Sequence, residues 1–322
     1  MRVVEVTRFG GPEVLAVRAV ADPVAGDGQV LIDVTAADVL FVDTAIRDGW
    51  GREWFSVAPP YVAGNGVAGT VGAVGAGVDA ALVGRRVLAQ TGANGGMSPT
   101  GGYAEQAVVA ATALVPVPDR LGLPEALALL HDGPTVVSIL DSAELRPGQR
   151  VLITAAGGSL GTLLVPLAKA AGAEVIGAAR GARKLEFVRE WGADTVVDYS
   201  EPGWTSGLTD VDVVLDGAGG EIGGEAFTTI RRGGRLLAYG SPGGDFAHVD
   251  PAEAARREVR VVGILDLGKG LDKQDAVARM LRRAAAGEVT PLVGQTFPLA
   301  EAAAAHRAIA ARETVGKTLL LI

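Results

Sequence analysis

The chain has 322 residues, contains no cysteine and carries a formal net charge of −8 at pH 7. This length exceeds the usual range of one domain, so two domains are expected. Without cysteine the chain has no disulfide and no thiolate metal site, and its negative charge argues against binding to nucleic acid or anionic membranes. Because no membrane span or secretory signal is visible, a soluble cytoplasmic protein is expected.

The first part of the chain is rich in β-branched residues, glycine and proline, and predicts a small β-rich unit. Its candidate strands are residues 2–6, 13–20, 29–39, 68–75, 85–90 and 103–110.

From about residue 124 apolar strands alternate with helices, which is typical of a parallel sheet covered on both faces. The expected strands are residues 150–155, 174–179, 195–199, 211–218, 235–240 and 259–265. Two further helices, at residues 275–287 and 299–312, precede a last strand at residues 317–322.

The segment AAGGSLG lies between a predicted strand and a predicted helix, where a dinucleotide-binding fingerprint occurs. Ala156, Gly158 and Gly161 fall at its three glycine positions, with alanine in the first. Glycine in the middle lets a pyrophosphate approach the backbone, and the third glycine lets the helix pack on the strand. The N–H groups of Ser159, Leu160 and Gly161 at the helix start would then bind the phosphates. An ordinary strand-to-helix turn is the alternative.

The end of the next strand indicates which nucleotide is bound. An NAD site needs an acidic residue there, but this chain has Ala179 followed by Arg180, and then Arg183 and Lys184. The missing acid, together with Arg180 and Lys184, favours the 2′-phosphate of NADPH. The alternative is that these cations cover a solvated helix start.

Several motifs occur in order along nearly the whole chain: FGGPEVL, AADVLFVDTAIRDG, LRPGQRVLITAAGGSLG, AKAAGAEVIG and TFPLAEAAAAHRAIAARETVGKTLLL. In these motifs the chain resembles the medium-chain dehydrogenase/reductase superfamily, in its zinc-free quinone oxidoreductase (zeta-crystallin-like) branch. The resemblance implies an α/β protein with a GroES-like β-rich catalytic domain, residues 1–122 and 270–322. It also implies an NADPH-binding Rossmann domain with a doubly wound parallel sheet, residues 123–269, and a homodimer formed through its last strand.

The segment AGNGVAG stands where the zinc-dependent relatives carry a catalytic motif. Asn65 and Gly66 correspond to their histidine ligand and the neighbouring glutamate, and neither is a useful zinc ligand. The three histidines are far apart in sequence, so an enzyme without metal is expected. His131 precedes a segment that approaches the nicotinamide in relatives, whereas His306 is expected to be structural.

In relatives the segment that matches residues 37–49 lines the substrate space. The family usually has Asn-Pro where this chain has Leu40-Phe41, so an apolar side chain replaces an amide donor. The expected substrate pocket consists of Leu40, Phe41, Trp50, Trp54 and Asn65. The aromatic residues in this region either stack on a flat substrate or pack between loop and core. Asp43 and Tyr61 are candidates for proton transfer, with solvent as the alternative donor.

The resemblance also implies further cofactor contacts: Thr135, Tyr199, Gly240, Ser241, Ile264 and Lys317. The resulting prediction is a zinc-independent NADPH oxidoreductase that reduces a quinone or the C=C bond of an α,β-unsaturated carbonyl. An enoyl-thioester reductase and a non-catalytic NADPH-binding protein are the alternatives.

Overall fold

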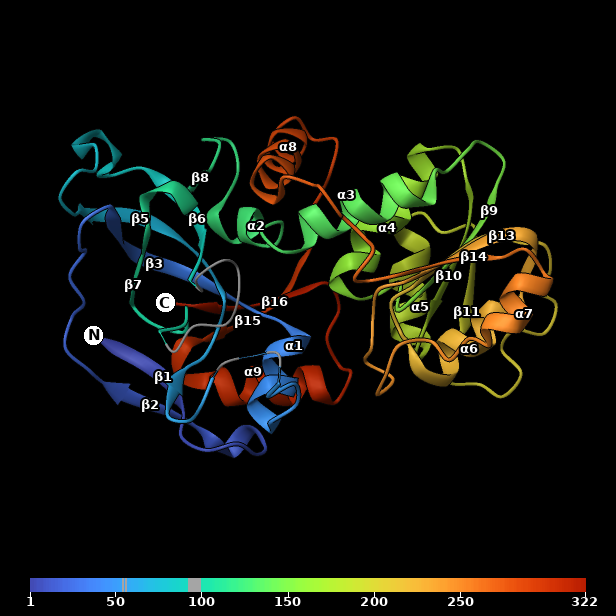
Figure 1. Ribbon diagram of the computed structural model, residues 1–322, viewed down its shortest axis with the longest axis horizontal. Helices are drawn as coiled ribbons and strands as arrows, with labels where there is room; N and C mark the ends of the chain where they lie inside the picture. The colour runs from blue at the N-terminus through green and yellow to red at the C-terminus, as the bar shows by residue number, and fades with distance from the viewer. Residues whose placement is uncertain (54, 56, 92–99) are drawn as a thin grey trace. The chain divides into compact units, whose positions relative to one another are not determined.

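The computed structural model describes residues 1–53, 55, 57–91 and 100–322. The chain divides into two compact units, residues 1–131 with 273–322, and residues 132–272 (Figure 1). Both boundaries lie later in the chain than the ranges expected from the sequence. Helix α2 (Leu123–Leu127) packs against the sheet of the first unit, which moves the first boundary beyond it.

The first unit contains ten strands among the described residues, and it draws them from both ends of the chain. They are β1 (Arg2–Val6), β2 (Leu15–Ala19), β3 (Gln29–Val39), β4 (Tyr61–Val62), β5 (Gly66–Val74), β6 (Arg86–Gln90), β7 (Gln106–Ala110), β8 (Val115–Pro116), β15 (Val293–Pro298) and β16 (Lys317–Leu321). A seven-stranded sheet has the order β15-β16-β3-β5-β6-β8, with β7 paired to β3, and a smaller sheet has the order β2-β1-β4.

Along the chain, the helical elements of the first unit alternate with its strands. They are α1 (Phe41–Asp48), α2, α8 (Lys273–Ala285) and α9 (Ala302–Ala310), with short 3-10 turns at Pro12–Val14, Ala80–Leu82, Ala111–Ala113 and Leu299–Glu301. Strand β16 pairs antiparallel with β3, and α9 packs on α1 and on both C-terminal strands. In Figure 1 red β16 accordingly lies beside blue β3.

Strand β3 changes character along its length. Val30, Ile32 and Val34 are buried and alternate with more exposed residues, as expected for a strand with one solvated face. From residue 36 to residue 39 every residue is buried, and this stretch includes a carboxylate, Asp38. A charge at such a position needs partners, because burial penalises an unpaired ion.

The second unit is a parallel six-stranded sheet with helices. Its strands are β9 (Arg150–Thr154), β10 (Glu174–Ala179), β11 (Thr195–Asp198), β12 (Val211–Asp216), β13 (Ile230–Ala238) and β14 (Arg260–Gly263). Its helices are α3 (Asp132–Ala143), α4 (Ser159–Ala170), α5 (Ala182–Glu190), α6 (Gly220–Thr228) and α7 (Pro251–Arg256). The strand order β11-β10-β9-β12-β13-β14 is the Rossmann order, which confirms the predicted fold class.

The last strand of this sheet is shorter than predicted. Strand β14 ends at Gly263, and the chain enters a turn at Ile264 and Leu265, where Gly263 O accepts hydrogen bonds from Asp266 and Leu267. β14 is nevertheless an edge strand, because it pairs with β13 alone.

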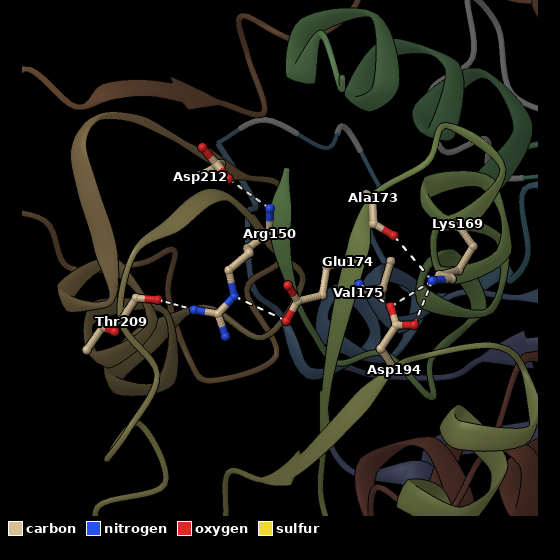
Figure 2. A network of polar contacts seen from close by, with 8 residues as sticks. All are labelled: Arg150, Lys169, Ala173, Glu174, Val175, Asp194, Thr209 and Asp212. Carbon is tan, nitrogen blue, oxygen red and sulfur yellow. Dashed lines mark hydrogen bonds and ion pairs between the residues drawn. The ribbon is translucent and has the colours of Figure 1, made fainter. Parts of the chain in front are cut away.

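Polar contacts gather where the strands of the second unit begin (Figure 2). Arg150, the first residue of β9, bonds to Glu174 at 3.2 Å and to Thr209 O, and its N–H donates to Asp212. Lys169 bonds to both oxygens of Asp194, each at 2.7 Å. The amino ends of parallel strands share one edge, so these contacts stabilise the edge opposite the one at which such sheets bind ligands.

Candidate functional site

In the Rossmann sheet successive strands are added in one direction from β9 and in the opposite direction from β12, and these two strands are neighbours. Their carboxyl ends therefore form a topological switch point. Ligands of open parallel sheets bind at such a switch point. Thr154 and Asp216 are the last residues of these two strands, and their side chains meet there. Thr154 Oγ1 donates to Asp216 Oδ1 at 2.6 Å and accepts the Gly217 N–H at 3.0 Å.

Asp216 also fixes the turn that follows β12. Its carboxylate accepts N–H bonds from Ala218 and Gly219 at 3.1 Å, while burial raises the pKa of Asp216. The sequence pattern did not point to Thr154 or Asp216. Their shared position, each ending a neighbouring strand, was the available signal.

The glycine-rich loop lies between β9 and α4, as predicted. Gly161 permits close packing, because a Cβ there would lie 2.5 Å from Ala156 O. A Cβ at Gly158 would lie 3.2 Å from Ala155 O, a tight contact, and within 4 Å of no other atom among the described residues. The left-handed residue of the loop is Ala155, with φ +51°, and not the alanine in the first glycine position.

Helix α4 begins at Ser159, followed by Leu160, with Gly158 as its N-cap. Thr162 N donates to Gly158 O, which is the first regular bond of the helix. The N–H groups of residues 159–161 precede it and face an approaching anion at the positive end of the helix dipole.

One of the two predicted phosphate-binding cations, Lys184, lies beside this loop. The side chain of Lys184 covers Gly157, where an added Cβ would lie 3.5 Å from the lysine Cβ. Arg180 follows the end of β10, and its charge acts on Asp198 at the end of β11. Asp198 accepts the Gly181 N–H at 2.8 Å, which ties the Arg180 turn to the neighbouring strand.

Tyr199 is held at the same edge. Its N–H donates to Ala179 O at 3.2 Å, and its ring contacts Trp204 edge-on at 6.3 Å between centroids. Asp198 was not foreseen as part of this region, because its bond to the Gly181 N–H joins residues that are 17 positions apart and meet only in the sheet.

The remaining predicted cofactor residues of the second unit follow strands β13 and β14, apart from Thr135. Gly240 N donates to Asp216 O at 3.1 Å, and a Cβ at Gly240 would lie 2.0 Å from Gly217 O. Ser241 follows it directly, and Ile264 follows the end of β14. Thr135 lies near the start of α3 and is half-buried.

In the first unit, Asp43 caps helix α1. Its Oδ2 accepts the Leu40 N–H at 2.8 Å, and Leu40 is the N-cap residue. Burial and the nearby charge of Asp38 raise the pKa of Asp43 to about 7. A carboxyl group with such a pKa can exchange protons near neutral pH.

The tyrosine that forms a hydrogen bond with Asp43 is Tyr103. Tyr103 donates to Asp43 Oδ2 at 3.4 Å, whereas Tyr61 packs in the hydrophobic core of the first unit. Burial, together with the charge of Asp43, raises the pKa of Tyr61. The structure therefore joins Asp43 to Tyr103 by a hydrogen bond and to Tyr61 through an electrostatic interaction.

The described members of the predicted substrate pocket lie at the start of α1, just after its end and just before β5. Phe41 packs against the hydrophobic core, with the Arg312 guanidinium 4.8 Å from its ring centre. Trp50 is 46% exposed and contacts Phe55 at 6.0 Å between ring centroids. Trp54 lies outside the described residues. Asn65 is buried, and its Oδ1 has no hydrogen-bond partner among the described residues.

Asp38 lies between a histidine and a lysine. Its Oδ2 is 2.8 Å from His131 Nδ1 and 3.3 Å from Lys317 Nζ. Lys317, expected at the cofactor, is thus directed to a buried carboxylate of its own unit. Burial opposes ionisation of Asp38, but the charges and hydrogen bonds of His131 and Lys317 outweigh it and lower the pKa of Asp38. Asp38, His131 and Lys317 are called the Asp38 cluster below.

Within the described ranges, no group of three or more His, Asp or Glu side chains could hold a metal ion. Within the same ranges, no helix is both long and apolar enough to span a membrane.

Two family models match the chain. One, described as alcohol dehydrogenase GroES-like domain, matches residues 26–119, and the other, described as zinc-binding dehydrogenase, matches residues 191–320. The quinone oxidoreductase of Rattus norvegicus is 31% identical over 333 residues, covering 100% of this chain and 98% of that protein. The 2-haloacrylate reductase of a Burkholderia species is 32% identical over 330 residues, covering 97% and 96%.

Solved structures agree over the whole chain. A structure described as an NAD-dependent alcohol dehydrogenase has a TM-score of 0.89 at 28% identity, and a mycobacterial protein in complex with NADPH has 0.85 at 32%. Each comparison covers 100% of both chains. The two units and these matches define a member of the medium-chain dehydrogenase/reductase superfamily. Within this superfamily the chain belongs to the quinone oxidoreductase family.

Proposed function

We propose that the protein is an NADPH-dependent oxidoreductase that transfers hydride to a quinone or to the C=C bond of an α,β-unsaturated carbonyl. The observation that carries this proposal is the carboxyl edge of the Rossmann sheet. There Gly158, the start of α4 and Lys184 lie together, and Arg180 follows the end of the neighbouring strand β10. When bound, NADPH supplies the hydride, and a mycobacterial relative is known in complex with NADPH.

The residues of this edge have separate roles in holding the nucleotide. The N–H groups at the start of α4 bind the pyrophosphate, and Gly158 keeps side-chain atoms away from it. Arg180 and Lys184 bind the 2′-phosphate, which distinguishes NADPH from NADH. Thr154 and Asp216 accept hydrogen bonds from the N–H groups of the Gly217–Gly219 turn and so fix its conformation beside the nucleotide.

The names of two relatives support the substrate classes. One is a quinone oxidoreductase, and the other is named as a reductase of 2-haloacrylate. Both reactions place a hydride on an electron-poor carbon or oxygen and need a proton donor for the charge that develops. Reduction of an enoyl thioester is the second candidate, since it has the same chemistry at the reacting carbon. A non-catalytic NADPH-binding protein is the third.

Assays of NADPH oxidation with a naphthoquinone, a simple enone and crotonyl thioester separate these candidates. We expect turnover with the quinone or the enone and less with the thioester. Faster turnover of the thioester would favour the second candidate. Tight NADPH binding without turnover of any acceptor would leave only the non-catalytic protein.

We also propose that the reaction needs no zinc. The place of the zinc-binding motif of relatives is taken by Asn65 and Gly66, and the chain has no cysteine. Dialysis against a strong chelator should leave activity unchanged. Metal analysis of the purified protein should find a molar ratio of zinc to protein chain well below one. Loss of activity on chelation, with recovery on adding zinc, would contradict this proposal.

A homodimer through β14 is the proposed assembly. This strand has an unpaired edge within the described sheet, and Val261 on it is 43% exposed. Exposed apolar edge strands are normally covered. Val261→Arg should convert a dimer to a monomer in light scattering, whereas Val17→Arg, at a valine 41% exposed on edge strand β2, should not. The cytoplasmic location expected from the sequence stays a prediction.

A further inference from the structure

Helix α4 contains a proline that deprives one of its carbonyl groups of the usual partner. In an α-helix the N–H of each residue donates to the carbonyl four residues earlier. Pro166 lies inside α4 and has no N–H, so Thr162 O cannot receive this bond. Thr162 is buried, where an unpaired carbonyl destabilises the fold. The sequence of α4 therefore creates a need for a donor from outside the helix.

The indole of Trp191 supplies this donor. Trp191 Nε1 donates to Thr162 O at 2.7 Å. Trp191 is the C-cap residue of α5, and its ring stacks on Phe187, one turn earlier, at 4.8 Å between centroids and an angle of 23° between the planes. The stacking holds the indole in place, and the hydrogen bond joins the first half of α4 to the end of α5.

Helix α5 also contacts the glycine-rich loop and the sheet. Lys184, in its first turn, covers Gly157 of the loop. Val188 packs directly on β10, because a Cβ at Gly177 would lie 2.3 Å from Val188 Cγ1. The contact at Gly177 sets how closely α5 approaches the sheet, and the bond from Trp191 sets its position relative to α4.

The two ends of α5 are held by different bonds. At the start, the Gly181 N–H donates to Asp198 at 2.8 Å, which anchors the helix to the end of β11. The helix has nine residues, about 13 Å, and a helix this short moves as a rigid body. With its start anchored, the bond from Trp191 at its other end fixes the direction of α5. The direction of α5 in turn determines where the side chain of Lys184 points.

We propose that Trp191 is a positioning residue for the choice of nucleotide, because it holds α5 in the orientation in which Lys184 reaches the 2′-phosphate of NADPH. This inference rests on the proposed function, which assigns Lys184 and Arg180 to that phosphate. Trp191 itself does not touch the nucleotide and acts through α5. A charge-assisted contact weakens with distance, so a displaced ammonium lowers the affinity for NADPH. NADH lacks the phosphate and its affinity stays the same.

The main test is Trp191→Phe, which keeps an aromatic ring beside Phe187 but removes the N–H. Fluorescence titrations at constant ionic strength give the dissociation constants of NADPH and NADH. We expect the constant for NADPH to rise about threefold, within the range of one hydrogen bond, and the constant for NADH to stay the same. General damage to the nucleotide site would weaken both nucleotides alike. An unchanged ratio of the two constants in folded Trp191→Phe would overturn the proposal.

Pro166→Ala separates the positioning role from a purely structural one. It gives residue 166 an N–H that can donate to Thr162 O, so the carbonyl no longer depends on the indole. Trp191→Phe should therefore lower Tm less in the Pro166→Ala background than in the wild-type background. The change in the nucleotide ratio should be the same in both backgrounds, because α5 loses its bond to α4 in each. A ratio that Trp191→Phe no longer changes once Pro166 is replaced would overturn the proposal.

Trp204→Phe is the matched control. Its indole donates to Glu225 elsewhere in the second unit, so this variant also loses one indole hydrogen bond. We expect the ratio of the two dissociation constants to stay that of the wild-type protein. A change as large as that in Trp191→Phe would show that the ratio responds to any lost indole bond, and would overturn the specific role of Trp191.

These measurements need no turnover, so the inference and the proposed function can fail separately. A protein that binds NADPH with the expected ratios but reduces no acceptor would refute the proposed activity alone. An unchanged ratio in Arg180→Ala/Lys184→Ala would refute the phosphate site, and the inference with it. A lowered preference for NADPH in that double variant, but not in Trp191→Phe, would refute the inference alone.

Discussion

Arg47 donates a hydrogen bond from Nη1 to Nδ1 of His306 at 3.1 Å, in the interior of the first unit. Because a guanidinium can only donate, Nδ1 of His306 accepts, and the hydrogen of the neutral ring is on Nε2. Nε2 lies 3.0 Å from the hydroxyl of Tyr103, which in turn donates to Asp43. This chain of contacts, the Arg47 network, joins α9 to α1, so the structural role expected for His306 is one of linking the two ends of the chain.

The Arg47 network predicts a stability that depends on pH. Burial and the charge of Arg47 lower the pKa of His306 from 6.5 to about 3. Between these values the unfolded chain binds a proton that the folded protein does not, so the free energy of unfolding should rise with pH by at most about 1.4 kcal/mol per unit. Urea unfolding of wild type and His306→Gln from about pH 4 to 7 measures this. An equal slope in the variant would show that His306 is not responsible.

Asp43 should have the opposite effect. Its pKa rises from 3.8 to about 7 on folding, so the folded protein holds a proton that the unfolded chain has released. The stability from this group is fully present below pH 3.8 and is lost as pH rises through 7. Asp43→Asn keeps an acceptor for the Leu40 N–H but cannot titrate. Compared with the wild-type protein, the variant should therefore lose less stability between about pH 5 and 8 in urea unfolding. The same loss in both proteins would contradict the prediction.

The two glycines of the cofactor loop should respond differently to alanine. Gly161→Ala places a Cβ 2.5 Å from Ala156 O, and we expect a clear fall in Tm because backbone must move. Gly158→Ala places its Cβ 3.2 Å from Ala155 O, a tight contact that a small shift can relieve, so Tm should change less. NADPH binding, measured by fluorescence, should weaken in both. Unchanged NADPH affinity in folded Gly158→Ala would argue against a pyrophosphate at this position.

Replacing the cations near the loop should change the choice of nucleotide. The double variant Arg180→Ala/Lys184→Ala should weaken NADPH binding by at least about tenfold, because a charge-assisted contact to the 2′-phosphate is lost. NADH, which lacks that phosphate, should bind about as before. Arg189→Ala removes an exposed cation from α5, the helix that contains Lys184, and should change the binding of neither nucleotide. An equal loss for NADH and NADPH would show that the cations do not read the phosphate.

The parts of the site that could be predicted from the sequence are those built from contiguous residues. The loop between β9 and α4 could be predicted because a strand, a glycine pattern and a helix follow one another within a few residues. The Asp38 cluster could not be predicted in this way, since His131 and Asp38 are separated by 93 residues and meet only through the fold. Tyr103 was missed for the same reason, because nothing near Asp43 in the sequence distinguishes it from Tyr61.

The pairing of β16 with β3 has a consequence for the order in which the protein forms during synthesis. Residues 132–272 are contiguous and can fold as soon as they leave the ribosome, whereas the first unit needs strands from both ends of the chain. Until β16 emerges, residues 36–39 of β3 have an open edge and Asp38 lacks Lys317. We therefore expect the first unit to be the late-folding part, and the nascent chain to be most prone to aggregation during that interval.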